Sequence, residues 1–450
     1  MIQTILTIWL FSVVILSFIK IKWGVALFLL YFILIPGFNI GIEGLGQGQN
    51  IMFFIVLVAY LFYSFKNNIK SDFKILSPFF VLYIVLFFEI PFQEEMNFGD
   101  KIYYWLREAM GSLILPFVIL NVMKHDASSI KTFKQIMIFC IVLTVCYGLF
   151  QTSIGGANPY TMSFVGILDI DQKMESYYIN EGSGRLFGRI SSFFIHPMTF
   201  AMFLGCSIIY LVSLIKTNKS FKLVLLLLAS VALGVICGVR SVIGGLVIAS
   251  IYYLIVVRNF KVLIYTSISV VLLITILSYF PDLQNYIYSI IDSKSSNVGG
   301  SSLEMRLTQL NGAVSLMMQN PLFGLGTGWT TYYMTIHGDH PVCLAFESLL
   351  MVIICNNGII GVIIWIHLIF KYLQLNNSKT FVDGKIVQAL LIFYVSYSAI
   401  TGDYGYMKYF LLFYVMAISE SFNNKIKCIN QDELYSSNYR IVSPSISSHS

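Results

Sequence analysis

The chain has few charged residues for its length. Only 11% of its 450 residues are Asp, Glu, Lys or Arg, whereas 57% are hydrophobic and the mean hydropathy is +0.78. A soluble globular protein carries roughly 25% charged residues, because its surface faces water. The composition therefore excludes a soluble globular protein and predicts a polytopic membrane protein.

The sequence also lacks the signatures of several functional classes. A P-loop, a Rossmann glycine fingerprint and a serine-nucleophile elbow are all missing, which argues against a nucleotide-driven reaction. The seven cysteines show neither a disulfide framework nor a metal-ligand spacing. Asp169 and Asp171 form a D-x-D pair, but such short coincidences are common in acidic loops. His337, Asp339 and His340 have no fourth ligand at a regular spacing, so we predict neither a metal site nor a cofactor.

About thirteen apolar runs are long enough to cross roughly 30 Å of hydrocarbon. They predict an all-α bundle of about 12–13 transmembrane helices within a transmembrane domain at residues 1–422. The first run has no basic residue before it and no small-residue cleavage site, so we expect an uncleaved helix. The serine-rich residues 423–450 are expected to form a disordered cytoplasmic tail. The runs lie near 2–19, 23–40, 51–65, 75–92, 106–123, 135–153, 193–215, 222–239, 241–257, 262–280, 345–370, 386–400 and 405–422.

Lysine and arginine are concentrated in every second loop between the runs. The positive-inside rule places these loops in the cytoplasm and the two large loops, at about 154–192 and 281–344, on the external face. The net charge of +6 then reflects topology, and no nucleic-acid partner is expected. Few ionisable groups fall deep inside a run, which argues against an ion-coupled carrier. The basic residues that topology leaves unexplained are Lys101, Arg107, Lys173, Arg185, Arg189, Arg240, Lys294, Arg306 and Lys408.

The longest polar interruption runs from Ser301 to Gly361. Ser301 and Glu304 form a capping box that predicts a helix start, and Asn320-Pro321 predicts its end. Three glycines in the following PLFGLGTGW predict a loop that a ligand can approach closely. Apolar residues mark one face of the helix, which we expect to lie flat at the membrane surface with this face against lipid or protein. They are Leu303, Leu307, Leu310, Val314 and Met317.

Four arginines are candidates for binding a diphosphate, because the planar guanidinium matches its oxygens. Arg240 stands in GVRSVIGG between apolar helices, where a charge needs an anionic partner or water. The alternative is a structural salt bridge between Arg240 and a nearby carboxylate such as Glu347. Arg185 and Arg189 open RLFGRISSFFIHP, where contact with lipid phosphate is equally plausible. Arg306 follows on the amphipathic helix.

The order of these motifs resembles the O-antigen ligase and polymerase superfamily of bacterial envelope glycan assembly. RLFGRISSFFIHPMTFA, GVRSVIGGLV, NPLFGLGTGW and NNGIIGVIIW follow one another over about residues 180–370. The resemblance implies a C-type glycosyltransferase-like bundle with two large external loops and functional arginines at Arg240 and Arg306. It also implies a polar catalytic residue, which in the ligases is a histidine eleven residues before the first glycine of the G-x-x-G. Here that residue is Glu347, and His340 is the nearest histidine, which favours the Wzy-type polysaccharide polymerases.

The resemblance implies an inverting, metal-independent glycosyltransferase in the bacterial cytoplasmic (inner) membrane, with its active site on the external, periplasmic face. It would polymerise undecaprenyl-diphosphate-linked oligosaccharide units into capsule, O-antigen or exopolysaccharide. The arginines would stabilise the leaving diphosphate, and Glu347 or His340 would accept the proton of the acceptor hydroxyl. A flippase and a chain-length regulator are the expected protein partners.

Three alternatives remain. An O-antigen ligase would transfer finished polymer to a final acceptor. A transporter or flippase of lipid-linked sugars would need a comparable anion site facing the cytoplasm, where the basic residues lie in short topological loops. A structural scaffold would leave Arg240 without a purpose.

Overall fold

The structure, a computed structural model, describes residues 2–36, 48–167, 189–257, 303–377, 384–402 and 404–419. Within these ranges the chain forms helices joined by turns, and His340 pairs with Leu344 in an isolated β-bridge. Six of the described helices are long and apolar enough to cross a membrane by length and composition. The prediction of an all-α polytopic membrane protein is confirmed.

The observed helices follow the predicted apolar runs closely. In the first half they are α1 (Ile2–Ile19), α2 (Ile21–Leu34), α3 (Gly48–Lys66), α4 (Ser77–Glu89), η1 (Ile90–Phe92), α5 (Phe98–His125), α6 (Ala127–Ser153) and α7 (Pro159–Met162). In the second half they are α9 (Pro197–Thr217), α10 (Phe221–Ile236), α11 (Arg240–Val257), α14 (Leu303–Met317), α15 (Trp329–His337), α16 (Leu349–Asn376), α17 (Gly384–Ile400), η2 (Tyr404–Tyr406) and a helix at 407–419. The run near 262–280 and the tail lie outside the described residues.

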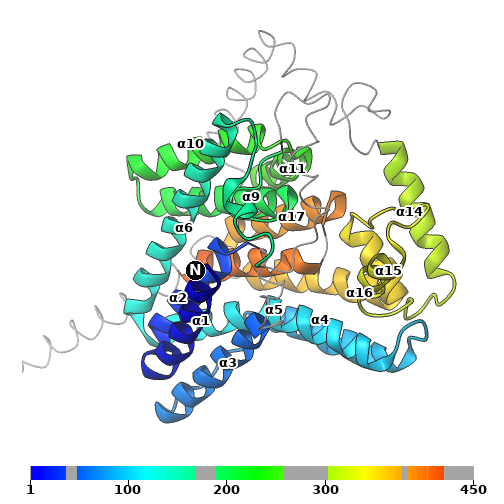
Figure 1. Ribbon diagram of the computed structural model, residues 1–450, viewed down its shortest axis with the longest axis horizontal. Coiled ribbons are helices and arrows are strands. Elements are labelled where there is room, and N and C mark those ends of the chain that lie inside the picture. Colours follow the sequence, from blue (N-terminus) through cyan, green and yellow to red (C-terminus); the bar gives the residue numbers. More distant parts are fainter. Residues whose placement is uncertain are drawn as a thin grey trace, which may run out of the picture.

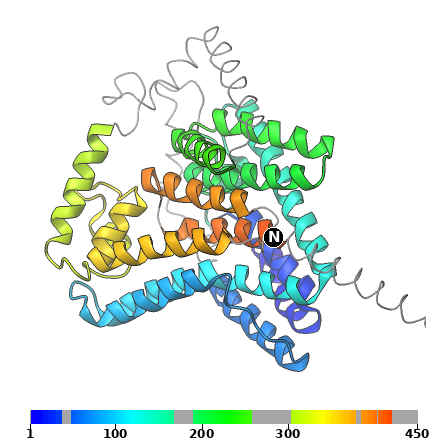
Figure 2. The same cartoon turned by 180° about the vertical axis from the view of Figure 1, so that it is seen from behind.

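The centre of the bundle is formed by α16, α17 and the helix at 407–419. Figures 1 and 2 show α4 and α5 along one side of these helices, α9, α10 and α11 along the other, and α14 and α15 at one end. Every residue from 407 to 419 is buried. A helix that is enclosed on all sides can be apolar around its whole circumference, as this one nearly is.

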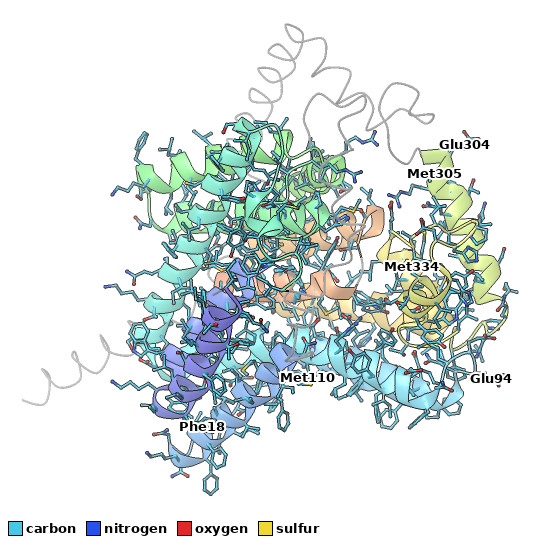
Figure 3. The ribbon with its side chains drawn as sticks, in the orientation of Figure 1. Phe18, Glu94, Met110, Glu304, Met305 and Met334 are labelled. Atoms are coloured by element: carbon cyan, nitrogen blue, oxygen red, sulfur yellow. The ribbon has the colours of Figure 1, made fainter. Side chains whose placement is uncertain are left out.

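The outer surface of the bundle is apolar. On α1, Phe11, Ile15 and Phe18 are more than half exposed, and Phe18 points away from the bundle in Figure 3. Leu225 and Leu228 of α10 are equally exposed. Such surfaces are unfavourable in water but suit contact with lipid tails.

Loops assigned to the cytoplasm by the positive-inside rule meet one another in the fold. Lys22 donates a hydrogen bond to Ser128 Oγ (2.9 Å), and Lys124 forms an ion pair with Asp72. Asp126 caps α6 by accepting from the backbone N–H of Ser128 (2.9 Å). The loops at 20–22, 66–74 and 124–128 therefore lie together at one end of the bundle. Which side of the membrane this end faces stays a prediction.

Only part of the predicted apolar face of the amphipathic helix α14 packs against the protein, where Leu310 and Met317 are partly buried. Gln309 and Ala313 are buried, whereas Leu307 and Val314 of the predicted apolar face are 55% and 39% exposed. The helix ends before Asn320-Pro321 as predicted, while Ser301 of the capping box lies outside the described residues. The predicted loop PLFGLGTGW follows at residues 321–328, and its last residue, Trp329, begins α15 (Trp329–His337).

Candidate active site

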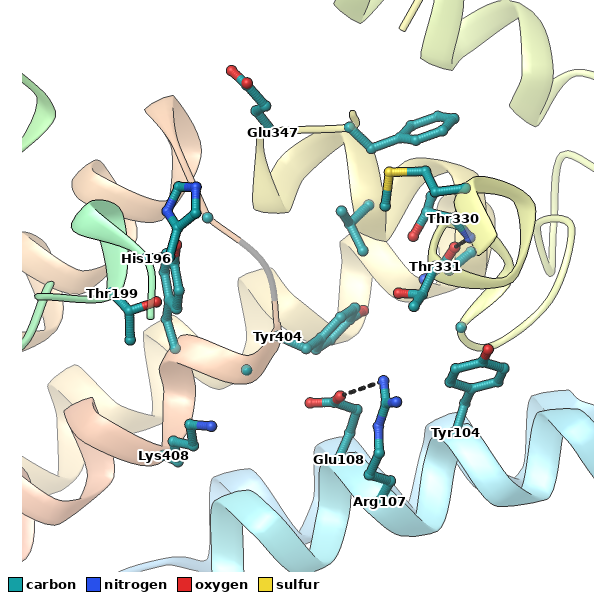
Figure 4. A pocket seen from close by; sticks show the side chains of 18 of the residues that line it. Tyr104, Arg107, Glu108, His196, Thr199, Thr330, Thr331, Glu347, Tyr404 and Lys408 are labelled. Carbon is teal, nitrogen blue, oxygen red and sulfur yellow. Dashed lines mark hydrogen bonds and ion pairs between the residues drawn. The ribbon is translucent and has the colours of Figure 1, made fainter. Parts of the chain in front are cut away.

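A cavity of about 680 Å³ lies between α4, α5, the start of α9, the α15–α16 region and residues 401–409. Its volume falls in the range, roughly 300–1,000 Å³, that encloses a small-molecule ligand. Figure 4 shows charged and polar side chains entering it from opposite walls. The charged lining residues are Arg107, Glu108, Glu347 and Lys408.

Glu347 stands on the cavity wall and is held in place by two other elements. Nη2 of Arg306, from α14, lies 2.7 Å from its Oε2, and the backbone N–H of Gly402 donates to its carbonyl oxygen (2.9 Å). Leu344 and Phe346, just before it, have φ angles of 51° and 48°, a left-handed conformation that is unfavourable for such side chains. Strained backbone of this kind is concentrated at functional sites. The carboxylate and the guanidinium predicted for the site are therefore in direct contact.

Arg189 and Arg240 lie at one corner of the fold. Arg240 is the first residue of α11, and the backbone N–H of Ile190, next to Arg189, donates to the carbonyl oxygen of Cys237 (3.3 Å) in the preceding turn. Glu347, one possible salt-bridge partner of Arg240, is paired with Arg306. The fourth arginine, Arg185, lies outside the described residues.

His340 occupies the turn that leads to Glu347. Its Nδ1 accepts hydrogen bonds from the backbone N–H groups of Val342 (3.2 Å) and Cys343 (3.0 Å), so the proton of the neutral ring is on Nε2. Burial lowers the pKa of His340 below its usual value. The ring packs against Phe346, with centroids 5.6 Å apart. In this geometry His340 supports the loop that carries Glu347 and presents a hydrogen-bond donor.

A second histidine, His196, lines the cavity at the start of α9 (Figure 4). Its Nδ1 caps the helix by accepting from the backbone N–H of Met198 (3.2 Å). Burial, with the nearby charge of Arg189, lowers the pKa of His196 to about 4. The ring is therefore neutral at physiological pH and, like His340, carries its proton on Nε2.

The cavity floor is built where α16 breaks at Gly358. This residue has φ 59° and ψ −150°, which interrupts the hydrogen-bond ladder of the helix. The loop at 321–328 takes up the released groups. Ile359 N–H donates to the carbonyl of Pro321 (2.9 Å), and Leu325 N–H donates to that of Cys355 (2.8 Å). The NNGIIG and NPLFGLGTGW motifs thus form one unit.

The side chain of Asn357, on this floor, connects α16 to two further elements. Its Nδ2 donates to Oε2 of the buried Glu89 on α4 (3.0 Å), and its Oδ1 accepts from the hydroxyl of Tyr404 (2.9 Å). The neighbouring Asn356 accepts from the backbone N–H of Thr330 through its Oδ1 (3.0 Å). Amide side chains provide both donors and acceptors, so two adjacent asparagines can hold α4, α15, α16 and η2 at fixed positions.

Sequence reasoning did not select Arg107, Glu108 or Lys408 as site residues. Arg107 Nη2 lies 3.3 Å from Glu108 Oε1, and its guanidinium covers the ring of Tyr104 at 4.9 Å from the centroid. Lys408 enters from the helix at 407–419 (Figure 4). A signal for these residues was present, because Arg107 and Lys408 are among the basic residues that topology leaves unexplained. Across the described ranges, no three His, Cys, Asp or Glu side chains converge as a metal site would require.

The comparison with known families matches one segment of the chain. Residues 223–366 fit the family model described as O-antigen ligase. No curated protein matches the chain. The match confirms the resemblance to the O-antigen ligase and polymerase superfamily and indicates a membrane enzyme of this type. We call residues 223–366 the ligase-type segment. It contains Arg240, Arg306, Glu347 and the break in α16. The cavity-lining residues Arg107, 194–199 and 401–409 lie outside this segment.

Proposed function

We propose that the protein is a membrane glycosyltransferase that polymerises oligosaccharide units carried on undecaprenyl diphosphate. The observation that carries this proposal is the 2.7 Å contact between Arg306 and Glu347 on the wall of a cavity large enough for a sugar ligand. It places an anion-binding group beside a proton acceptor, which are the two groups that glycosyl transfer from a lipid diphosphate requires. The ligase-type segment supports the same class of reaction.

In the proposed reaction, an acceptor hydroxyl attacks the anomeric carbon of the sugar attached to the diphosphate. The new glycosidic C–O bond forms as the bond from the anomeric carbon to the diphosphate oxygen breaks. The hydroxyl proton passes to Glu347, whose Oε1 accepts no hydrogen bond from a described residue. Attack opposite the leaving group inverts the configuration at this carbon.

Arg306 stabilises the departing diphosphate. A guanidinium has five N–H donors, and Arg306 directs one at Glu347 and a second, weaker one at Gln309 (3.4 Å). The remaining N–H donors of Arg306 are available for phosphate oxygens. We assign additional positive charge to Arg189 and Arg240, which lie at one corner of the fold, and to Arg185. In this proposal, the departure of the diphosphate needs neither a metal ion nor a nucleotide. His340 is the alternative proton acceptor, although its observed tautomer is a donor.

An O-antigen ligase is the second candidate, because the matching family model is described by that activity. The polymerase is favoured by Glu347, which stands where the ligases have a histidine. Both functions use the same donor and differ in the acceptor, so the material that accumulates without the protein distinguishes them.

Deletion of the gene in its native host tests the proposal. A polymerase joins copies of one lipid-linked unit, so the deletion strain should contain glycans of a single repeat, and the plasmid-borne gene should restore long chains. Lipid extraction followed by gel electrophoresis and mass spectrometry gives the chain lengths. Full-length polymer accumulating on undecaprenyl diphosphate would identify a ligase, and unprocessed units confined to the cytoplasmic leaflet would identify a flippase.

A further inference from the structure

We propose that Arg107 and Glu108 of α5 form a saccharide-binding subsite of the cavity, which takes an uncharged, hydroxyl-rich sugar of the lipid-linked unit. The proposal rests on the proposed function and adds residues from outside the ligase-type segment to its site. Figure 4 shows both side chains rising from α5 between Tyr404 and Tyr104, on a different wall from Glu347.

The hydrogen-bonding capacity of the pair is incompletely used. Glu108 accepts one contact of 3.3 Å from Arg107 Nη2, and no other hydrogen bond links it to a described residue. The Nε atom of Arg107 is buried and has no hydrogen-bond partner among the described residues. Buried polar groups in native structures are nearly always paired, so unpaired groups beside a cavity are available to hydrogen-bond a ligand there. The two side chains are each 22% exposed, which leaves them accessible to a molecule in the cavity.

The arrangement matches the chemistry of a sugar. A carboxylate accepts hydrogen bonds from two hydroxyl groups, and a guanidinium donates to hydroxyl or ring oxygens. The face of Tyr104 lies against the guanidinium of Arg107 at 4.9 Å and limits its movement. Thr330 and Thr331 add hydroxyl groups from α15 on the facing wall (Figure 4). Such a set of fixed donors and acceptors orients a polyhydroxylated ring.

The charges of the cavity favour a neutral ligand. Among its described lining residues, Arg107 and Lys408 are positive and Glu108 and Glu347 are negative, so the four charges cancel. His196 adds no charge, since its pKa is about 4. A diphosphate would need an excess of positive charge, which we place outside the cavity, at Arg306 and at the corner with Arg189 and Arg240. The sugars would then extend from the diphosphate into the cavity.

Binding of two ligands to the purified full-length protein tests the subsite. The probes are the lipid-linked repeat unit, extracted from the deletion strain, and undecaprenyl diphosphate without sugar. For Glu108→Gln and Arg107→Lys we expect roughly tenfold to hundredfold weaker binding of the sugar-bearing probe, the effect of losing a hydrogen bond to a charged group. Binding of undecaprenyl diphosphate should stay within about twofold of wild type, which also shows that the variants are folded. Glu94→Gln, which changes an exposed carboxylate outside the cavity, is the matched control.

Each other outcome has a definite meaning. Equal loss of both probes would assign the pair to anion binding or to folding and overturn the subsite, as would unchanged binding of both. A sugar-dependent difference that disappears at high salt would indicate an acidic sugar and overturn the uncharged class. If the wild-type protein binds both probes equally well, the subsite is wrong while the proposed function stands. Failure of the wild-type protein to bind either probe would reject the proposed function as well.

Discussion

The contact between Arg306 and Glu347 couples the two chemical roles assigned to the site. The two side chains are 20% and 30% exposed, and ion pairs with this much solvent access typically stabilise a protein by only about 0.2–1 kcal/mol. Its contribution to folding is therefore small. In the proposed reaction, the pair instead fixes the carboxylate relative to the guanidinium, so that a diphosphate bound by Arg306 would bring its sugar next to Glu347.

Substitutions at this pair should reduce activity without a comparable loss of stability. Arg306→Lys keeps a positive charge but loses the planar geometry that matches phosphate oxygens, and Glu347→Gln keeps size but loses the proton acceptor. We expect both to lose most of the polymer, measured as chain length in the complemented deletion strain, with normal expression and thermal midpoints. The exchange variant Arg306→Glu/Glu347→Arg preserves the ion pair but exchanges the positions of the two groups. It therefore controls for loss of the ion pair itself.

Two results would reassign these roles. Full-length polymer in the exchange variant would show that the pair acts only as a structural contact. Normal polymer in Glu347→Gln together with its loss in His340→Ala would move the proton acceptor to His340.

At the scale of single elements, the break in α16 decides the shape of the site. An unbroken helix would retain its backbone hydrogen bonds within itself, and the 321–328 loop would have no groups to pair with. The break instead exposes the carbonyl of Asn356, which accepts from the backbone N–H of Gly326 (3.2 Å) and from Gln93 Nε2 (3.2 Å). The asparagine side chains beside Gly358 are thereby directed at α4, α15 and η2, which form three sides of the cavity.

Gly358→Ala should disrupt this element. A Cβ at Gly358 would lie 2.6 Å from the carbonyl oxygen of Pro321 and 2.7 Å from the backbone nitrogen of Gly324, and its φ of 59° with ψ of −150° is unfavourable for alanine. Conformational strain of this kind costs about 1–3 kcal/mol before the backbone contacts are counted. We expect a lower thermal midpoint in detergent and little polymer in cells.

The matched control is Gly99→Ala in the first turn of α5. This glycine is exposed, and a Cβ there would meet nothing within 4 Å. Alanine is favoured over glycine in helices, so this variant should keep its stability and activity. A thermal midpoint of Gly358→Ala equal to that of Gly99→Ala would show that the break does not depend on glycine.

At the scale of the whole molecule, the two ends of the bundle have different chemistry. One end holds the basic loops joined by the Lys22–Ser128 and Lys124–Asp72 contacts. Toward the other end, the loop at 338–348 leads to Glu347, whose carbonyl bonds to Gly402 after α17. Lipid-linked sugars reach such a cavity only from the leaflet it faces, so the orientation of the bundle determines where the reaction occurs.

Thiol labelling in intact cells, after any outer membrane is made permeable, measures this orientation. Cysteine at Ser163 or Thr335, both exposed, should react with a membrane-impermeant reagent, whereas cysteine at Lys131 should react only after lysis. The background should carry Cys146→Ser and Cys428→Ser, because Cys146 is exposed and Cys428 lies outside the described residues. Labelling of Lys131→Cys alone in intact cells would invert the topology and place the site in the cytoplasm.

The sequence alone was sufficient to locate the helices and the ligase-type segment. Each helix that crosses a bilayer must be apolar over about 20 residues, so its position is recorded locally in the chain. Asn320-Pro321 likewise acts on its own backbone, and the end of α14 before it was predicted from these neighbouring residues. The break at Gly358 was not predicted, because the run at 345–370 is apolar on both sides of it. The class of enzyme followed from the order of motifs over about residues 180–370, and the family match at residues 223–366 lies within this range.

Only the tertiary structure decided which side chains meet. Arg306 contacts the carboxylate of Glu347, 41 positions away in the sequence. Arg107 of α5 shares a cavity with Lys408 of the last described helix, at 407–419. Periodicity describes the faces of one helix but not the helix that packs against each face. For the same reason the predicted apolar face of α14 leaves Leu307 and Val314 exposed, while Gln309 is buried. In a membrane protein, lipid covers apolar side chains as well as another helix does, so hydrophobicity alone cannot select the packed face.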